Sequence, residues 1–236
     1  MRDAISRPVP EGGAAETRWD WLYRIGGAAA LLSVAIVPVQ IAVFVLLPPP
    51  STAAGWFALF QNNAFAGLLA FEILFVADAV IGIPTLLALY AALRRSGESF
   101  MAIALALGLV ASTALVTARP AIEMLYLSGQ YAAATADAQR TMLLAAGEAM
   151  RAIFYGTAFN ASNIIGSINL LIIPLVMLRS GSFGKAAPAM GILAGAIGFA
   201  MYAPTVGLFL GVASAAFLAA WRIMISIRFF RMARRS

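Results

Sequence analysis

Two carboxylates stand inside an apolar stretch of the chain, as Glu72 and Asp78 of "FEILFVADAVIGIP". An ionisable side chain among apolar residues needs a partner or a use, and the typical uses are proton transfer and ion binding. On membrane-insertion scales a central aspartate costs about 2.5 to 3.5 kcal/mol, whereas each Leu, Ile, Phe or Val returns about 0.3 to 0.6. The stretch can therefore carry one central charge, but it carries two only with partner groups.

The partner predicted for Glu72 is Arg119, in a charge-assisted pair. Only residues 94 to 99 connect the apolar segments that contain these two side chains, so the segments should be antiparallel neighbours. Arg119 can also reach Glu123, four residues further on. Glu72 and Asp78 lie six residues apart, about 120° around a helix, so they should not share one proton. We interpret Glu72 with Arg119 as a structural pair rather than a binding site.

Asp78 has a different setting, with no cation evident nearby in the sequence. Pro84 has no amide hydrogen, so the carbonyl of Val80 is left open just after Asp78, and Gly82 weakens the same turn. Asn163 is the side chain that we predict beside Asp78. The pair is either interhelical packing or a site for an ion or a proton, and the sequence leaves both interpretations open.

The composition sets the class of protein that must position these groups. Of 236 residues, 62% are hydrophobic and 11% charged, with a mean hydropathy of +0.90, which indicates a membrane protein. Cysteine and histidine are absent, so thiolate, imidazole and disulfide chemistry are excluded. We predict no cofactor, no metal and no enzymatic activity. The basic residues stand at the ends of apolar segments, which is typical of membrane topology rather than of nucleic-acid binding.

The apolar segments predict an all-α, polytopic transmembrane bundle of six spans, within a membrane domain at 22–230. Residues 1–21 form a predicted mobile cytoplasmic tail. An amphipathic outer helix is predicted within 131–158, before span four. The last apolar block is divided at Tyr202–Thr205. The predicted spans are 22–47, 64–93, 100–118, 159–178, 187–203 and 205–227.

The basic residues also predict the orientation. With the N-terminus in the cytoplasm, 13 of the 16 Lys and Arg residues fall inside and three fall outside, as the positive-inside rule requires. Both termini should then be cytoplasmic. Trp19, Trp21 and Trp221 are predicted as anchors at the inner interface, and Trp56 at the outer one.

The polar residues within these spans gather at similar depth. With roughly 1.5 Å of rise per residue from the inner end of each span, Asp78 lies about 23 Å deep and Asn163 lies level with it. Glu72, Arg119 and Asn160 lie at roughly 27 to 32 Å. We therefore predict one polar site in the outer half of the membrane.

Three segments carry a resemblance: "VADAVIGIPTLLALYAALR", "TARPAIEMLYLSG" and "LRSGSFGKAAPAMGILAGAIG". Together they are similar to the bacterial six-span membrane proteins grouped as domain-of-unknown-function family 4386, over roughly residues 20 to 230. The resemblance implies a six-span helical fold and a bacterial cytoplasmic (inner) membrane. It implies no activity, ligand or catalytic residue.

Two functions fit these observations. The first is a non-enzymatic bundle of unassigned role, held together by its polar groups; the alternative is a small permease or proton-coupled carrier that uses Asp78. An intramembrane enzyme is the weakest interpretation, because no histidine exists to hold a metal. The expected partner is the lipid bilayer, and a small-molecule ligand stays unknown. Two pairs of glycines, predicted to pack neighbouring spans or to form a homo-oligomer, are Gly191/Gly195 and Gly207/Gly211.

Overall fold

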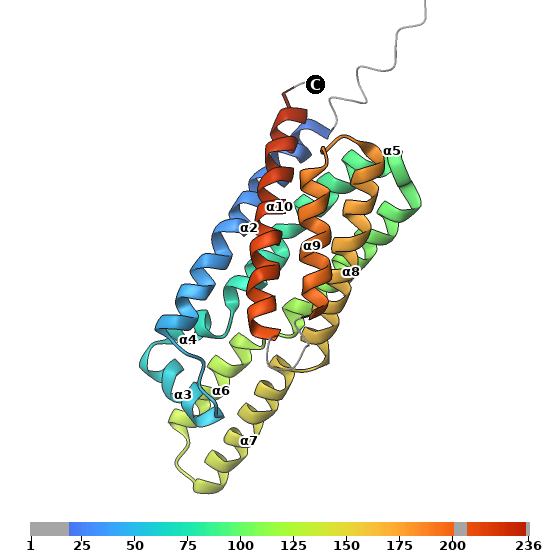
Figure 1. The fold of residues 1–236 in the computed structure, drawn as a ribbon. Coiled ribbons are helices and arrows are strands. Elements are labelled where there is room, and N and C mark those ends of the chain that lie inside the picture. The colour runs from blue at the N-terminus through green and yellow to red at the C-terminus, as the bar shows by residue number, and fades with distance from the viewer. Residues whose placement is uncertain (1–18, 201–206, 235–236) are drawn as a thin grey trace, which may run out of the picture.

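The computed structural model describes residues 19–200 and 207–234, and the regular structure in these residues is entirely helical (Figure 1). The predicted tail lies outside them as far as residue 18, and so does the turn predicted at Tyr202–Thr205. The helices are α2 (Asp20–Leu46), α3 (Ala53–Asn62), α4 (Ala64–Ala70), α5 (Ile73–Thr117), α6 (Ala121–Ala133), α7 (Asp137–Phe154), α8 (Thr157–Ser180), α9 (Ala186–Ala200) and α10 (Gly207–Met232).

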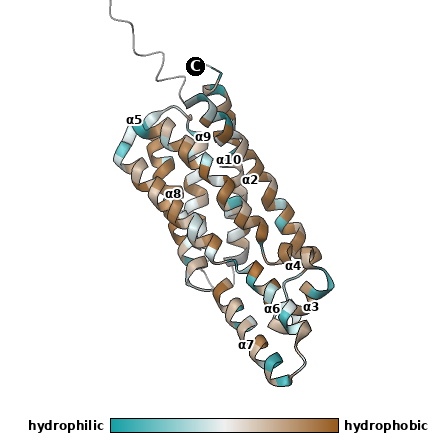
Figure 2. Ribbon diagram, turned by 180° about the vertical axis from the view of Figure 1, so that it is seen from behind, coloured by the Kyte–Doolittle hydropathy of each residue, from teal (hydrophilic) through white to brown (hydrophobic). Residues whose placement is uncertain are grey.

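The helices form two layers. Helices α2, α5, α8, α9 and α10 make a bundle, and helices α3, α4, α6 and α7 cover one of its ends (Figure 1). We call these last four helices the cap. Figure 2 shows that the bundle is mostly hydrophobic, whereas hydrophilic residues recur in the cap and at the far end of α7. The beginning of α2 and the end of α10 lie at the end of the bundle away from the cap.

Helix α5 is two antiparallel helices joined at Gly97, where φ is 176° and ψ is 69° and the backbone leaves the helical conformation. Gly108 faces Leu86 across this turn, since a Cβ added to Gly108 would lie 2.3 Å from Leu86 Cδ2. The two residues are equally far from Gly97 along the chain. The segments on either side of residues 94 to 99 are therefore antiparallel neighbours, as predicted.

Four helical stretches in the described residues are long and apolar enough to cross a membrane: Asp20–Leu46, Ile73–Ala133, Asp137–Ser180 and Phe209–Met232. Helix α9 is apolar but shorter, with 15 residues. Length and hydropathy together are consistent with an integral membrane protein.

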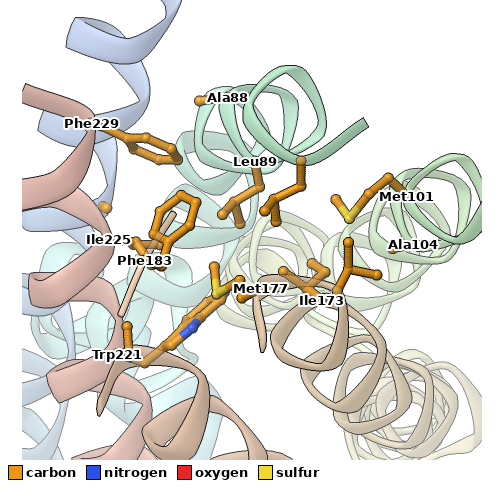
Figure 3. Close-up of a cluster of buried hydrophobic side chains, with 14 of the residues drawn as sticks. Ala88, Leu89, Met101, Ala104, Ile173, Met177, Phe183, Trp221, Ile225 and Phe229 are labelled. Carbon is orange, nitrogen blue, oxygen red and sulfur yellow. The ribbon is translucent and has the colours of Figure 1, made fainter. Parts of the chain in front are cut away.

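The bundle core lies in the half away from the cap. Leu89, Met101, Met177, Phe229 and neighbouring buried residues bring α2, α5, α8, α9 and α10 together there (Figure 3). Trp221 belongs to this core and is only 5% exposed, so its predicted role as an interfacial anchor is wrong. Its ring fills space between helices instead of lying at the bundle surface.

Four hydroxyl side chains tie neighbouring helices of the bundle to each other. Each donates a hydrogen bond of 2.8 to 2.9 Å to a backbone carbonyl on another helix, a type of contact worth about 0.6 kcal/mol within membranes. The donor and acceptor pairs are Thr85 and Gly26, Ser226 and Gly27, Ser162 and Ala111, and Ser214 and Ala194. Helix α2 is thus held to α5 and to α10 through two consecutive carbonyls.

The glycines predicted to pack spans five and six have different outcomes. An added Cβ at Gly191 would lie 2.5 Å from Pro174 Cγ, and one at Gly195 would lie 3.0 Å from the Ser167 carbonyl oxygen. Both glycines are therefore used in packing α9 against α8 within one chain. The pairing of Gly207 with Gly211 stays a prediction, as does any homo-oligomer.

The helix bounds depart from the predicted spans at the cap. The stretch predicted as one span at 64–93 is interrupted at Phe71 and Glu72, and α3 and α6 lie where no helix was predicted. Helix α7 occupies the stretch predicted to be amphipathic but ends at Phe154, separate from α8. Trp56, predicted at the outer interface, is buried in the core of the cap at 2% exposure.

Candidate functional site

The predicted partner of Glu72 is the one that the structure shows. Arg119 Nε donates to Glu72 Oε2 at 2.5 Å, and the two side chains are 1% and 11% exposed, respectively. The ion pair is therefore almost completely buried within the protein. Each charge therefore depends on the other for its stability, because a buried charge without a partner is costly.

Arg119 has further partners around its guanidinium group. Its Cζ lies 4.3 Å from the ring centre of Phe154 and 4.4 Å from that of Phe159, which are cation–π contacts. Its Nη1 donates at 3.2 Å to the carbonyl oxygens of both Ala118 and Phe154. The guanidinium is thus held by a carboxylate, two carbonyls and two aromatic faces.

These contacts connect three of the points where the chain passes between a helix of the cap and a helix of the bundle. Glu72 lies between α4 and α5, Ala118 and Arg119 lie between α5 and α6, and Phe154 is the last residue of α7. Glu72 has φ 62° and ψ 32°, and among the described residues it is the one non-glycine with positive φ. Such a conformation costs about 1 to 3 kcal/mol and persists only where its surroundings impose it. We infer that the ion pair keeps Glu72 in this conformation between α4 and α5 and thereby fixes the cap on the bundle.

The predicted setting of Asp78 is wrong, because a cation is present. Arg222 on α10 binds Asp78 on α5 through three contacts, from Nη1 to both carboxylate oxygens and from Nη2 to Oδ2, each at 3.2 Å. The side chains are 15% exposed for Asp78 and 18% for Arg222. This two-pronged geometry is the one that suits a guanidinium and a carboxylate best.

Arg222 was not among the site residues predicted from the sequence. It stands ten residues before the last residue of α10, which places it about 15 Å inside that helix. Side chains on a helix tilt toward its N-terminus, which for α10 is the end nearer the cap. The missed signal was its position inside the predicted span 205–227, followed by the apolar residues of "IMISI".

Other contacts are recorded for the remaining predicted site residues. Asn163 donates to the Phe159 carbonyl at 3.0 Å, within its own helix, so its predicted pairing with Asp78 is wrong. Asn160 donates to the carbonyls of Tyr155 and Gly156, at the break between α7 and α8. Glu123 is exposed in the first turn of α6, where a negative charge suits the helix dipole, and the ion-pair partner of Arg119 is Glu72 instead. The predicted single polar site is therefore two separate ion pairs.

A third charged contact holds the cap together. Glu148 on α7 accepts a hydrogen bond of 2.7 Å from the amide of Ala53, the first residue of α3, and also pairs with Arg151 on its own helix. The helices are close here, since a Cβ at Gly147 would lie 2.8 Å from the Phe57 ring and 2.9 Å from Ala53 Cβ. The carboxylate thus caps the N-terminus of a neighbouring helix.

This cap contact predicts an acid-sensitive cap. The hydrogen bond from the Ala53 amide, helped by Arg151, holds the pKa of Glu148 below its ordinary value of 4.5. A carboxyl group with a lowered folded-state pKa stabilises the folded protein above its unfolded-state pKa, and this contribution is lost as the pH falls through the lowered value. The protection factor of the Ala53 amide in hydrogen exchange, which is the intrinsic rate at a given pH divided by the observed rate, should therefore fall below about pH 4.5.

Glu148→Gln should remove most of this pH dependence, whereas Glu98→Gln, at an exposed position, should leave it intact. An unchanged protection factor at Ala53 between pH 7 and pH 3 in the unaltered protein would contradict the capping role.

Neither ion pair of the bundle lines either of two hollows on the described part of the chain. One hollow lies between α2 and α10, and the other lies on α5 beside Leu109, Thr113 and Thr117. Asp78 and Arg222 contribute to neither of them.

Comparisons with protein-family models, with curated proteins and with solved structures found no match to this chain. The resemblance to family 4386 therefore stays a prediction drawn from three sequence segments. The fold and the ion pairs are consistent with an integral membrane protein made of apolar helices, and the function is inferred from their geometry.

Proposed function

We propose that this protein is a non-enzymatic membrane bundle of six spans, with an outer helical cap, whose intramembrane charges hold its helices together. One observation carries the proposal: Asp78, the deepest carboxylate predicted from the sequence, is bound at 3.2 Å by Arg222 from another helix. A carboxylate neutralised in this way is a structural element rather than a free proton acceptor. In this proposal the spans are α2, the two arms of α5, α8, α9 and α10.

The distribution of basic residues supports a cytoplasmic location for the end of the bundle away from the cap. The turn at Gly97 carries Arg94 and Arg95, and the connection from α8 to α9 carries Lys185. The C-terminal end of α10 adds further arginines, whereas the cap carries few basic residues. The positive-inside rule then puts the cap outside the cytoplasm, in a bacterial inner membrane by the resemblance described above.

A small permease or proton-coupled carrier is the second candidate. It is favoured by the partial exposure of Asp78 and Arg222, 15% and 18%, which leaves the pair in contact with its surroundings. Pro84, six residues after Asp78 in the same helix, adds a site where the backbone can bend. In this alternative the ion pair separates during transport, and the Asp78 carboxylate takes up a proton in place of its contact with Arg222.

Proton flux into liposomes separates the two functions. For the bundle, protein-containing liposomes under a pH gradient should acidify no faster than protein-free ones, and Asp78→Asn should make no difference. The matched control is Glu123→Gln, which removes an exposed carboxylate. Flux that Asp78→Asn abolishes and Glu123→Gln preserves would contradict the bundle and support the carrier.

A further inference from the structure

A hollow opens between α2 and α10 at the end of the bundle away from the cap. Its volume is about 420 Å³, within the range of about 300 to 1,000 Å³ that small-molecule sites usually have. It is a shallow, open hollow, and its lining is mostly apolar. The residues that line it are Arg24, Ile25, Ala28, Phe230, Ala233 and Arg234.

A close contact between the two helices lies beside the hollow. Ser226 Oγ donates to the Gly27 carbonyl at 2.8 Å, and a Cβ added to Gly27 would lie 3.3 Å from the ring of Phe230. The two helices are therefore fixed against each other next to the hollow. Its walls belong to this contact and do not depend on a mobile loop.

The lining changes from charged to apolar with depth. Arg24 lies about 6 Å from the beginning of α2 at Asp20, and Ala28 about 12 Å from it. On the other wall Arg234 follows the end of α10, whereas Phe230 lies within the helix. The hollow thus has two guanidinium groups at one end, which we call its mouth, and apolar residues toward the other, which we call its floor. This is the polarity of a phospholipid that lies along the bundle from the membrane surface.

The charges at the mouth are available for an anion. The structure records three ion pairs among the described residues, and neither Arg24 nor Arg234 takes part in them. Asp20, one turn before Arg24 on the same helix, is the nearest carboxylate along the chain, and no ion pair between the two is among those recorded. Both arginine side chains belong to exposed residues.

We propose that this hollow binds an anionic phospholipid of the inner leaflet. Arg24 and Arg234 bind the headgroup phosphate, and one acyl chain lies along Ile25, Ala28 and Phe230. Basic pockets between membrane helices on the cytoplasmic side recognise anionic headgroups in this way. The proposal rests on the membrane placement proposed above but not on the absence of transport, so a positive flux result would leave it standing.

Native mass spectrometry of the full chain, released from nanodiscs, tests the site. The probes are phosphatidylglycerol and phosphatidylcholine in equal amounts, with inorganic phosphate as the competitor. The unaltered protein should retain phosphatidylglycerol selectively, and inorganic phosphate should not displace it. Equal retention of both lipids, or displacement by inorganic phosphate, would overturn the proposal.

Variants distinguish the hollow from the general positive charge of that end. Arg24→Gln with Arg234→Gln should weaken phosphatidylglycerol binding roughly 30-fold, since each basic residue near an anionic surface contributes a factor of about five. The control Arg95→Gln with Lys185→Gln removes the same charge from exposed positions at the same end and should have little effect. Equal losses in the two double variants would overturn the site.

A steric variant tests the apolar floor without changing charge. Ala28→Trp fills the hollow from an exposed position of α2 and should reduce lipid retention about as much as loss of the two arginines. Ala28→Leu, a smaller change, should give a smaller reduction and serves where the tryptophan variant does not fold. Full retention by a folded Ala28→Trp protein would contradict the seating of an acyl chain.

Discussion

Replacing Arg119 by methionine should lower the free energy of unfolding by about 3 to 5 kcal/mol, the usual cost of breaking a buried ion pair from one side. The change leaves the Glu72 carboxylate, 11% exposed, without its cation. It also removes the donor to the Phe154 carbonyl and the cation between two aromatic rings. Glu72 adopts a positive φ between α4 and α5. Without the contact with Arg119, nothing offsets the cost of this conformation.

Unfolding in mixed micelles of a mild detergent and dodecyl sulfate, followed by circular dichroism, measures this loss. Combining Glu72→Gln with Arg119→Met should recover part of it, because no charge is then left buried. Arg95→Met, at an exposed position, is the control and should change the stability by less than about 0.5 kcal/mol. If Arg119→Met behaved like this control, Arg119 would not be the residue that joins cap and bundle.

Replacing Arg222 by methionine should cost about 2.5 to 3.5 kcal/mol, the price of a lone carboxylate in the middle of a membrane helix. Asp78→Asn should cost less. Its amide oxygen still accepts a hydrogen bond from the guanidinium, and the long Arg222 side chain can extend toward the membrane surface. The same unfolding assay measures both variants, and a larger loss for Asp78→Asn than for Arg222→Met would contradict this order.

The two ion pairs differ in how far the sequence could predict them. Glu72 and Arg119 are 47 residues apart, but a short turn makes their helices antiparallel neighbours, so their relative depth follows from counting residues. Asp78 and Arg222 are 144 residues apart and lie on helices that no short turn connects. Which face of α10 meets α5 depends on the packing of the whole bundle. Counting residues along the chain therefore could not identify Arg222 as the partner of Asp78.

Hydrophobicity alone could not distinguish the helices of the cap from those of the bundle. Trp56, Phe57 and Phe71 are apolar enough to be anchors or parts of a span, yet they pack into a small core of their own. Burial among protein side chains and burial in lipid select the same residue types. No glycine or proline marks the break at Glu72, and the ion-pair partner of Glu72 there is the distant Arg119.

A double-mutant cycle on Asp78 and Arg222 tests whether Asp78, the carboxylate that the sequence predicts deepest in the membrane, is a structural partner of this arginine. Unfolding free energies are measured for the unaltered protein, Asp78→Asn, Arg222→Met and the double variant. We predict a coupling energy of at least about 1 kcal/mol, with the double variant more stable than Arg222→Met alone. Additive losses, with no coupling between the two positions, would contradict it.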